Sequence, residues 1–169
     1  MYNLYDISSR LLFDKDYLFI EKVYSYIKSI LKDEHNYQIQ CEYSKLLIVL
    51  LKFSSINLGE EILLYIEDNF VGSVNFYERR LFVSMFEEAI KQFSIEFLKN
   101  VLFINSFLAF LNNDKCMILS KLLNILPKIF PLLNIDKKIK PLILNRLEIL
   151  KKTKQKDYEF NLVNYNINI

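Results

Sequence analysis

The residue types that most often carry out catalysis or hold cofactors are scarce in this chain. His35 is its only histidine and lies in the charged stretch "KDEHNYQ". Because a histidine-based catalytic triad needs that side chain beside a nucleophile, we expect His35 instead to be an exposed residue of a turn. The only glycines, Gly59 and Gly72, cannot form a glycine-rich loop around a phosphate. The common zinc sites need more cysteine and histidine ligands than the chain contains.

Pairs of carboxylates are the next candidates, as general acid and base. Glu60–Glu61 and Glu87–Glu88 fall in helix-like stretches, where adjacent side chains point about 100° apart and do not converge on one atom. We expect both pairs to lie on solvated faces. Asp14 and Asp16 in "FDKDYLF" begin like a calcium-binding loop, but the glycine and the later ligands of such a loop are absent. Their expected role is to cap the helix that follows.

The two cysteines, Cys41 and Cys116, are too few for a disulfide framework and lack metal-binding spacing. Both fall near the start of a predicted helix, where we expect them to pack as small apolar side chains rather than to react. The sequence therefore predicts a protein that is not an enzyme and that has no cofactor and no metal. Free thiols favour a reducing compartment, the cytoplasm or alternatively the nucleus.

The elements that would position any site are expected to be helices. Of the 169 residues 52% are hydrophobic, while only two are glycine and three are proline. Such a composition supplies a core but too little turn chemistry for a many-stranded sheet. The apolar run "LLIVLL" at 46–51 is far below the roughly 18 residues that a membrane-spanning helix needs. Since the N-terminus also has no export pattern, we expect no membrane association.

Charge is nearly balanced over the whole chain but not along it. The net charge is +2, which gives no general attraction to nucleic acid or to membranes. Residues 54–88 carry seven acidic and two basic side chains, whereas residues 134–158 carry eight basic and three acidic ones. The basic segment could recognise an acidic surface.

Phenylalanines at regular intervals indicate a repeat. Phe13, Phe53, Phe93 and Phe130 each close a helix-like apolar pattern, and they are separated by 40, 40 and 37 residues. Periods near 40 residues, with two helices in each unit, are typical of helical arrays. We name the two helices of each predicted unit A and B.

Each predicted B helix has an apolar stripe on one face, as expected of an amphipathic helix. We expect these stripes, Phe93 included, to be buried. The three stripes consist of Tyr43, Leu46, Leu47, Leu50 and Phe53; of Leu81, Phe82, Met85, Phe86, Ala89, Ile90 and Phe93; and of Ile118, Leu119, Leu122, Ile125, Leu126, Ile129 and Phe130. Pro127 and Pro131 lie late in the third B helix and predict a kink or an early stop there.

The predicted A helices cover residues 16–32, 58–70, 95–111 and 136–152. Turns at 33–36 ("DEHN"), 72–75 ("GSVN") and 112–114 ("NND") separate them from the B helices. At these turns Asn36, Asn75 and Asp114 can accept hydrogen bonds from the first amides of the next helix. Gly72 suits the left-handed residue that often ends a helix.

Helix pairs of this length with Asn or Asp at the A–B turn resemble HEAT repeats. Within that class, "NFYERRLFVSMFEEAIKQFSIEFLKN" at 75–100 and "DKCMILSKLLNILPKIFPLL" at 114–133 resemble repeats of the scaffold subunits of protein phosphatases 2A and 4. In that family an Asp at the turn is followed by Val and Arg at the fourth and fifth positions. Asn75 with Arg80 keeps part of this pattern, while Asp114 is followed by Ile118 and Leu119 and so lacks the arginine. The resemblance covers the middle third of the chain; the flanks share only the period.

The predicted fold is therefore all-α: a short right-handed α-solenoid of HEAT-like helix pairs forming a single domain over residues 1–169. It comprises a partial capping helix at 1–13, full repeats at 14–54, 55–93 and 94–133, and a partial C-terminal repeat with a tail at 134–169. The end of the tail, "YEFNLVNYNINI", is either a fourth B helix or an extended segment.

This resemblance implies a non-catalytic scaffold or regulatory subunit that binds another protein, such as the catalytic subunit of a serine/threonine phosphatase. Self-association is a further expectation, because the end repeats of such arrays need covering. Arg79 and Arg80 could either join neighbouring turns or reach the carboxylates of a partner. The expected partner-binding residues, at the turns and on the B helices, are Asn36, Asn75, Arg79, Arg80, Asp114 and Lys121.

The basic run "KKTKQK" at 151–156 supports an alternative function. Followed by Tyr158 and Phe160, it could contact phosphates and stack on bases, and so dock the protein on a ribonucleoprotein such as the ribosome. A solvated helix end, an acidic protein partner and a membrane surface are the other readings of this run. The residues concerned are Lys151, Lys152, Lys154 and Lys156.

Overall fold

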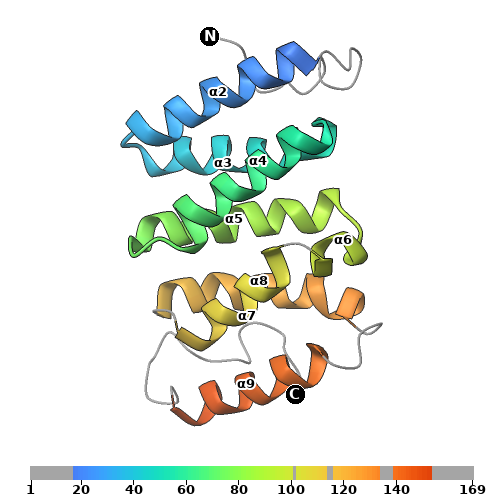
Figure 1. Cartoon of the computed structure of the whole chain (residues 1–169). Coiled ribbons are helices and arrows are strands. Elements are labelled where there is room, and N and C mark those ends of the chain that lie inside the picture. The colour runs from blue at the N-terminus through green and yellow to red at the C-terminus, as the bar shows by residue number, and fades with distance from the viewer. Residues whose placement is uncertain (1–16, 101, 114–115, 134–138, 154–169) are drawn as a thin grey trace. The chain divides into compact units, whose positions relative to one another are not determined.

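The computed structural model describes residues 17–100, 102–113, 116–133 and 139–153 (Figure 1). In these ranges the chain forms eight α-helices and one π-helix, with no β-strand. The predicted all-α class is confirmed. The chain divides into two compact units, Met1–Phe93 and Ser94–Ile169, and the boundary coincides with the end of the second predicted repeat.

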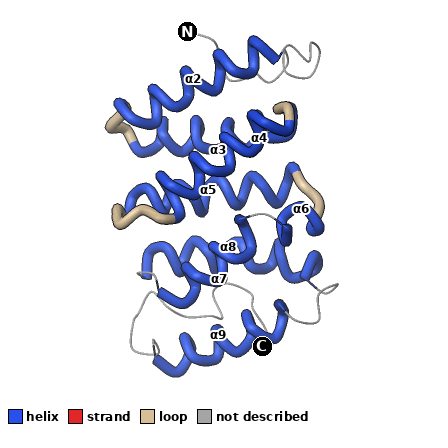
Figure 2. The backbone as a smooth tube through the Cα atoms, viewed as in Figure 1, coloured by secondary structure: helices blue, strands red, loops and turns tan. Residues whose placement is uncertain are grey.

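The first unit contains α2 (Tyr17–Asp33), α3 (Tyr37–Phe53), α4 (Ile56–Ile66), the π-helix η1 (Glu67–Val71) and α5 (Phe76–Gln92). Helix α3 packs against α2, α4 and α5, and α5 packs against η1. Side chains of α2 also contact α4, since the Tyr24 hydroxyl donates to the Glu61 carbonyl at 3.5 Å. The unit thus has two layers, α2 with α4 and η1 in one, and α3 with α5 in the other (Figure 1). Short loops join the helices (Figure 2).

The apolar stripes of α3 and α5 form the centre of this unit. On α5, Leu81, Phe82, Met85, Phe86 and Ala89 are all buried, and the Phe82 and Phe86 rings lie nearly parallel, at 3°, with centroids 6.4 Å apart. Burial of this stripe, with two rings four positions apart on one face, stabilises the segment as a helix in the protein.

Phe53 and Phe93 are only half-buried, so the expectation that Phe93 is part of the buried stripe is wrong. Helix α5 ends at Gln92, and Phe93 has extended backbone angles, φ −125° and ψ 155°. The hydroxyl of the next residue, Ser94, accepts a hydrogen bond from the Phe97 amide at 3.3 Å and so begins the next helix. Phe93 is therefore a junction residue whose ring leaves the α5 stripe.

The end of α4 also differs from the prediction. Ser55 caps α4, which begins at Ile56, and the last turn widens into η1. The Gly72 amide donates to the Glu67 carbonyl at 2.8 Å, a bond across five residues. With φ −74° and ψ −8°, Gly72 is right-handed, so the left-handed conformation predicted for it is wrong. The wide turn itself closes this helix end, and a left-handed residue is not needed.

Asn36 and Asn75 cap the helices that follow them, as predicted. The Asn36 side chain accepts from the Gln38 amide at 2.9 Å and from the Ile39 amide at 3.4 Å. The Asn75 side chain accepts from the Tyr77 amide at 3.0 Å. Each bond satisfies an amide that has no partner within its own helix.

Replacing either asparagine by alanine is expected to lower the free energy of unfolding by about 1 kcal/mol, whereas glycine should cost only a few tenths. Urea unfolding followed by circular dichroism measures the difference. An equal loss for Asn75→Ala and Asn75→Gly would mean that contacts of the side chain other than capping dominate at this position.

The second unit contains α6 (Ile95–Asn100), α7 (Leu102–Asn113), α8 (Cys116–Leu133) and α9 (Ile139–Thr153). Helix α7 contacts α6, α8 and α9, and α8 contacts α9. The helix predicted over 95–111 is described in two parts, α6 and α7, and residue 101 between them lies outside the described residues. The core residues include Phe103, Phe107 and Leu111 of α7, Leu122 and Leu126 of α8, and Ile143 and Leu147 of α9.

Helix α8 continues through both of its prolines to Leu133, so an early stop at Pro127 is wrong. Pro127 is exposed, while Leu126 and Ile129 beside it are buried. Burial of this stripe outweighs the hydrogen bond that the proline ring removes. The predicted capping helix at 1–13, Asp114 and the tail beyond Thr153 lie outside the described residues.

None of the helices in the described part of the chain is both long and apolar enough to cross a bilayer.

Candidate functional site

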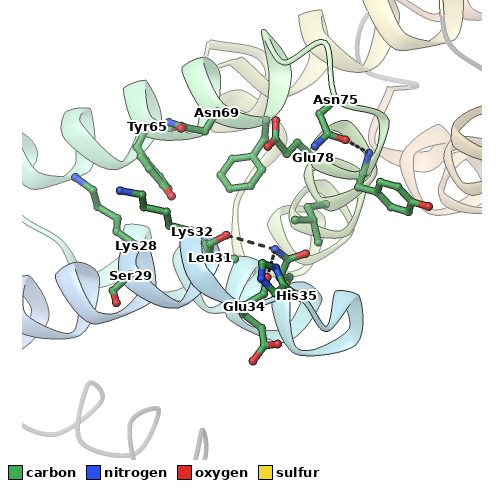
Figure 3. Close-up of a pocket in the computed structure, with 14 residues that line it drawn as sticks. Lys28, Ser29, Leu31, Lys32, Glu34, His35, Tyr65, Asn69, Asn75 and Glu78 are labelled. Atoms are coloured by element: carbon green, nitrogen blue, oxygen red, sulfur yellow. Dashed lines mark hydrogen bonds between the residues drawn. The ribbon is translucent and has the colours of Figure 1, made fainter.

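The first unit has an open groove of about 510 Å³. Its walls are the C-terminal half of α2, the turn between α2 and α3, the end of α4 with η1, and the start of α5 (Figure 3). Both predicted A–B turns of this unit therefore lie at one surface hollow. We call this hollow the turn groove.

Lysines of α2 form one wall of the turn groove. The Lys28 ammonium lies 4.8 Å from the centre of the Tyr24 ring and 5.2 Å from that of Tyr65, and it pairs with Glu61 at 3.4 Å. These contacts hold Lys28 in place, mostly through cation–π attraction at a half-exposed position. Lys32, one turn further on, is exposed and makes no hydrogen bond or ion pair within the described residues. Figure 3 shows both lysines extending towards Tyr65.

Tyr65 of α4 faces these lysines. Its ring packs edge-on against Tyr24, with centroids 6.2 Å apart, and against Phe70, at 5.7 Å. Burial raises the pKa of the Tyr65 hydroxyl, and the Glu78 carboxylate adds to the rise. The hydroxyl therefore stays protonated at neutral pH and can donate a hydrogen bond. It has no hydrogen-bond partner within the part of the chain that the structure describes.

The carboxylates of the turn groove are already used by the turns themselves. A Glu34 oxygen accepts the Asn36 amide at 2.7 Å. Glu78 accepts a short hydrogen bond from the Ser73 hydroxyl. Gln40 adds to the first turn by donating to the carbonyls of Leu31, at 3.4 Å, and Glu34, at 2.8 Å. These bonds fix the shape of the groove wall.

Arg79 and Arg80 both take part in the turns. Arg79 donates to the Ser73 carbonyl at 2.9 Å, within its own turn. The Arg80 Cζ atom lies 4.5 Å from the centre of the Tyr37 ring, and the centres of the Tyr37 and Tyr77 rings are 6.4 Å apart. Arg80 thus joins the second turn to the first, while its Nε atom is buried and has no hydrogen-bond partner among the described residues. Contact of either arginine with a partner protein stays a prediction.

The other predicted site residues lie in the second unit or outside the described residues. Lys121 is half-buried on α8, in the second unit. Lys151 and Lys152 belong to the last turn of α9. Asp114, Lys154 and Lys156 lie outside the described residues.

The candidates for catalysis do not converge within the described residues. Glu60 and Glu61 are exposed, and Glu61 pairs with Lys28. Glu88 binds Lys91 at 2.9 Å and Gln92 at 2.8 Å, on its own helix. His35 is exposed at the turn; Cys41 is buried, with its sulfur 3.7 Å from the Ser84 hydroxyl; and no three metal-ligating side chains cluster in the described ranges.

Sequence reasoning missed the α2 and α4 side chains of the turn groove. Tyr24, Lys28 and Lys32 are spaced at i, i+4 and i+8 and therefore share one face of α2. Tyr65, near the end of α4, and Asn69, in η1, are also four positions apart. This spacing could have identified these side chains from the sequence. What it could not reveal is that the two sets of side chains meet.

Comparison of the chain with protein-family models, with curated proteins and with solved structures finds no match.

Proposed function

We propose that this chain is a non-catalytic helical-repeat protein that binds another protein through the turn groove and its rim. The observation that carries the proposal is the meeting of two successive helix–helix turns at one open hollow with exposed apolar side chains beside it. Val74 is 97% exposed and Tyr77 59% exposed. Exposed apolar side chains next to fixed polar groups are the usual composition of a protein-docking surface.

A HEAT-like solenoid is the architecture that we propose with this function. Two facts support it: α2 packs on α3, and η1, which continues α4, packs on α5; and the turn within each of these two pairs lies at the same groove. The contact of Arg80 with Tyr37 joins these turns. Stacked helix pairs of this kind bind partners along one face.

The partner class that we propose is a subunit of a serine/threonine phosphatase complex, which this chain would serve as a scaffold or regulatory subunit. The support is the resemblance of residues 75–100 and 114–133 to scaffold repeats, together with the place of Asn75 and Arg80 at the turn.

The proposal is tested by using the full chain to capture partners from a lysate of its source, with and without nuclease. We expect a discrete protein to be retained in both cases. Replacing Val74 and Tyr77 together by serine should weaken its retention about tenfold, because exposed aromatic and aliphatic anchors at the centre of an interface contribute most of the affinity. Ile56→Ser, which removes a side chain that is 82% exposed at the start of α4, is the matched control.

Two outcomes would contradict the proposal. If Ile56→Ser reduced retention of the partner as much as the double substitution of Val74 and Tyr77 does, the rim of the turn groove would have no special role in binding. Recovery of ribosomal proteins, lost with nuclease or between about 50 and 200 mM salt, would favour docking on a ribonucleoprotein through the basic segment instead.

A further inference from the structure

The turn groove has an uneven supply of hydrogen-bonding groups. At its Tyr65 end, the Lys32 ammonium and the Tyr65 hydroxyl have no polar partner within the described residues, and Lys28 is shared between a carboxylate and two rings. At the turns, by contrast, both carboxylates already accept hydrogen bonds from neighbouring residues. Within the described residues, Glu61 is therefore the only polar partner of these three donors that a ligand would have to displace, and a ligand that binds them is an acceptor.

The ends of the groove also differ in charge. Figure 3 shows Lys28 and Lys32 together at the Tyr65 end, whereas Glu78 and Asn75 lie at the other end. The groove as a whole is lined by two lysines and two glutamates, so it has no net attraction for a long polyanion such as RNA. A single carboxylate placed at the lysine end would be attracted by both ammonium groups, and the charges of Glu61, which pairs with Lys28, and of Glu78, which acts on Tyr65, would oppose part of that attraction.

The exposed apolar side chains at the rim of the turn groove indicate which kind of residue stands beside the carboxylate in the ligand. Tyr77 lines the groove and is largely exposed, and Val74 is exposed on the same turn. Phe70 and Leu81, which also line the groove, are buried beneath. A large apolar side chain next to the acidic residue would cover the exposed part of Tyr77.

We infer that the turn groove binds an extended segment of the partner protein in which one Asp or Glu, held by Lys32, Lys28 and the Tyr65 hydroxyl, stands next to a large apolar residue held by Tyr77. This inference rests on the proposed function and names the chemistry of the partner. Lys32 is the residue on which recognition depends most, since no group in the described chain competes for its charge.

The test is a titration of the ¹⁵N-labelled full chain with N-acetyl-glutamyl-phenylalaninamide, followed by amide chemical shifts. We expect shifts confined to residues 28–40 and 65–81. The glutaminyl analogue, which lacks only the charge, should bind about tenfold more weakly, as should the glutamyl probe to Lys32→Glu. The lysyl analogue should bind Lys32→Glu better than the original chain. Tyr65→Phe keeps the ring but removes the hydroxyl. It should weaken binding of the glutamyl probe and leave binding of the other probes unchanged.

Lys22→Glu is the matched control, because Lys22 is exposed on the same helix and does not line the groove. Equal weakening by Lys22→Glu and Lys32→Glu would overturn the inference, as would equal binding of the glutamyl and glutaminyl probes. Preference for phenyl phosphate with no binding of the glutamyl probe would overturn it in favour of a phosphorylated ligand. Circular dichroism and the melting temperature show whether each variant is folded, and Lys32→Gln replaces Lys32→Glu if the latter is not.

The capture experiment separates failure of this inference from failure of the proposed function. If Lys32→Glu retains the partner as well as the original chain does, the inference is wrong and the proposed function stands. If the original chain retains no discrete protein, the proposed function is wrong whatever the probes show.

Discussion

Replacing Phe86 by alanine is expected to lower the free energy of unfolding by about 3–5 kcal/mol, the usual loss when a buried aromatic ring is removed. Phe86 is 0% exposed and stacks on Phe82, which is equally buried. Helix α5 also has the most extensive contact with α3 of any helix pair in the first unit. The cavity would therefore open in the interface between α3 and α5, where neighbours on both helices would have to move to fill it. Urea unfolding followed by circular dichroism at 222 nm measures the loss.

Phe93→Ala is the control for this prediction, since it removes the same ring from a half-buried position after the end of α5. Its cost should be no more than about half of that for Phe86→Ala, because less apolar surface returns to water. Equal losses for the two variants would mean that the junction after α5 is packed as tightly as the helix itself.

In the second unit, Arg146→Met is expected to cost about 1.5–2 kcal/mol, a value typical of a hydrogen bond from a charged donor. The Arg146 Nε atom donates to the Leu111 carbonyl at 2.8 Å. Leu111 is near the end of α7, where the last four carbonyls have no partner within the helix and the helix dipole favours a cation. The bond therefore ties α9 to α7 and satisfies a helix end at the same time.

Methionine keeps the apolar stem of Arg146 and removes its donors, and Arg146→Lys keeps the charge but not the planar guanidinium. We expect lysine to recover part of the lost stability through the helix dipole. Hydrogen exchange measures this directly, because amides of α9 should exchange faster in Arg146→Met than in the original chain. Unchanged protection of α9 would show that its apolar contacts with α7 and α8 are sufficient.

The repeated apolar spacing and the turn residues predicted the helices of the first unit well. Leu81, Phe82, Met85 and Phe86 are buried as their spacing indicates, and Asn36 and Asn75 begin helices as their side chains favour. These features follow from interactions within four residues along the chain, which is why a single sequence reveals them. The repeat architecture itself stays a prediction.

Features that depend on two distant segments escaped prediction. Lys28 and Tyr65 are 37 positions apart, and neither has a local reason to mark a site; only the meeting of α2 with α4 gives the turn groove its donors. The wide turn of η1 and the junction at Phe93 were missed for a related reason. Each is a local departure from α-helical geometry that packing selects, whereas the apolar pattern is compatible with a regular helix.

The aromatic side chains that line the turn groove can be followed by ultraviolet absorption and fluorescence. The chain has eleven tyrosines and no tryptophan, so its near-ultraviolet absorption and emission come from tyrosine, with a weaker part from phenylalanine. Tyr65 and Tyr77 both line the groove where a ligand would lie. The variant Tyr77→Trp would contain a single tryptophan. Its emission would therefore report changes in the exposure of the groove rim to water, without a contribution from another indole.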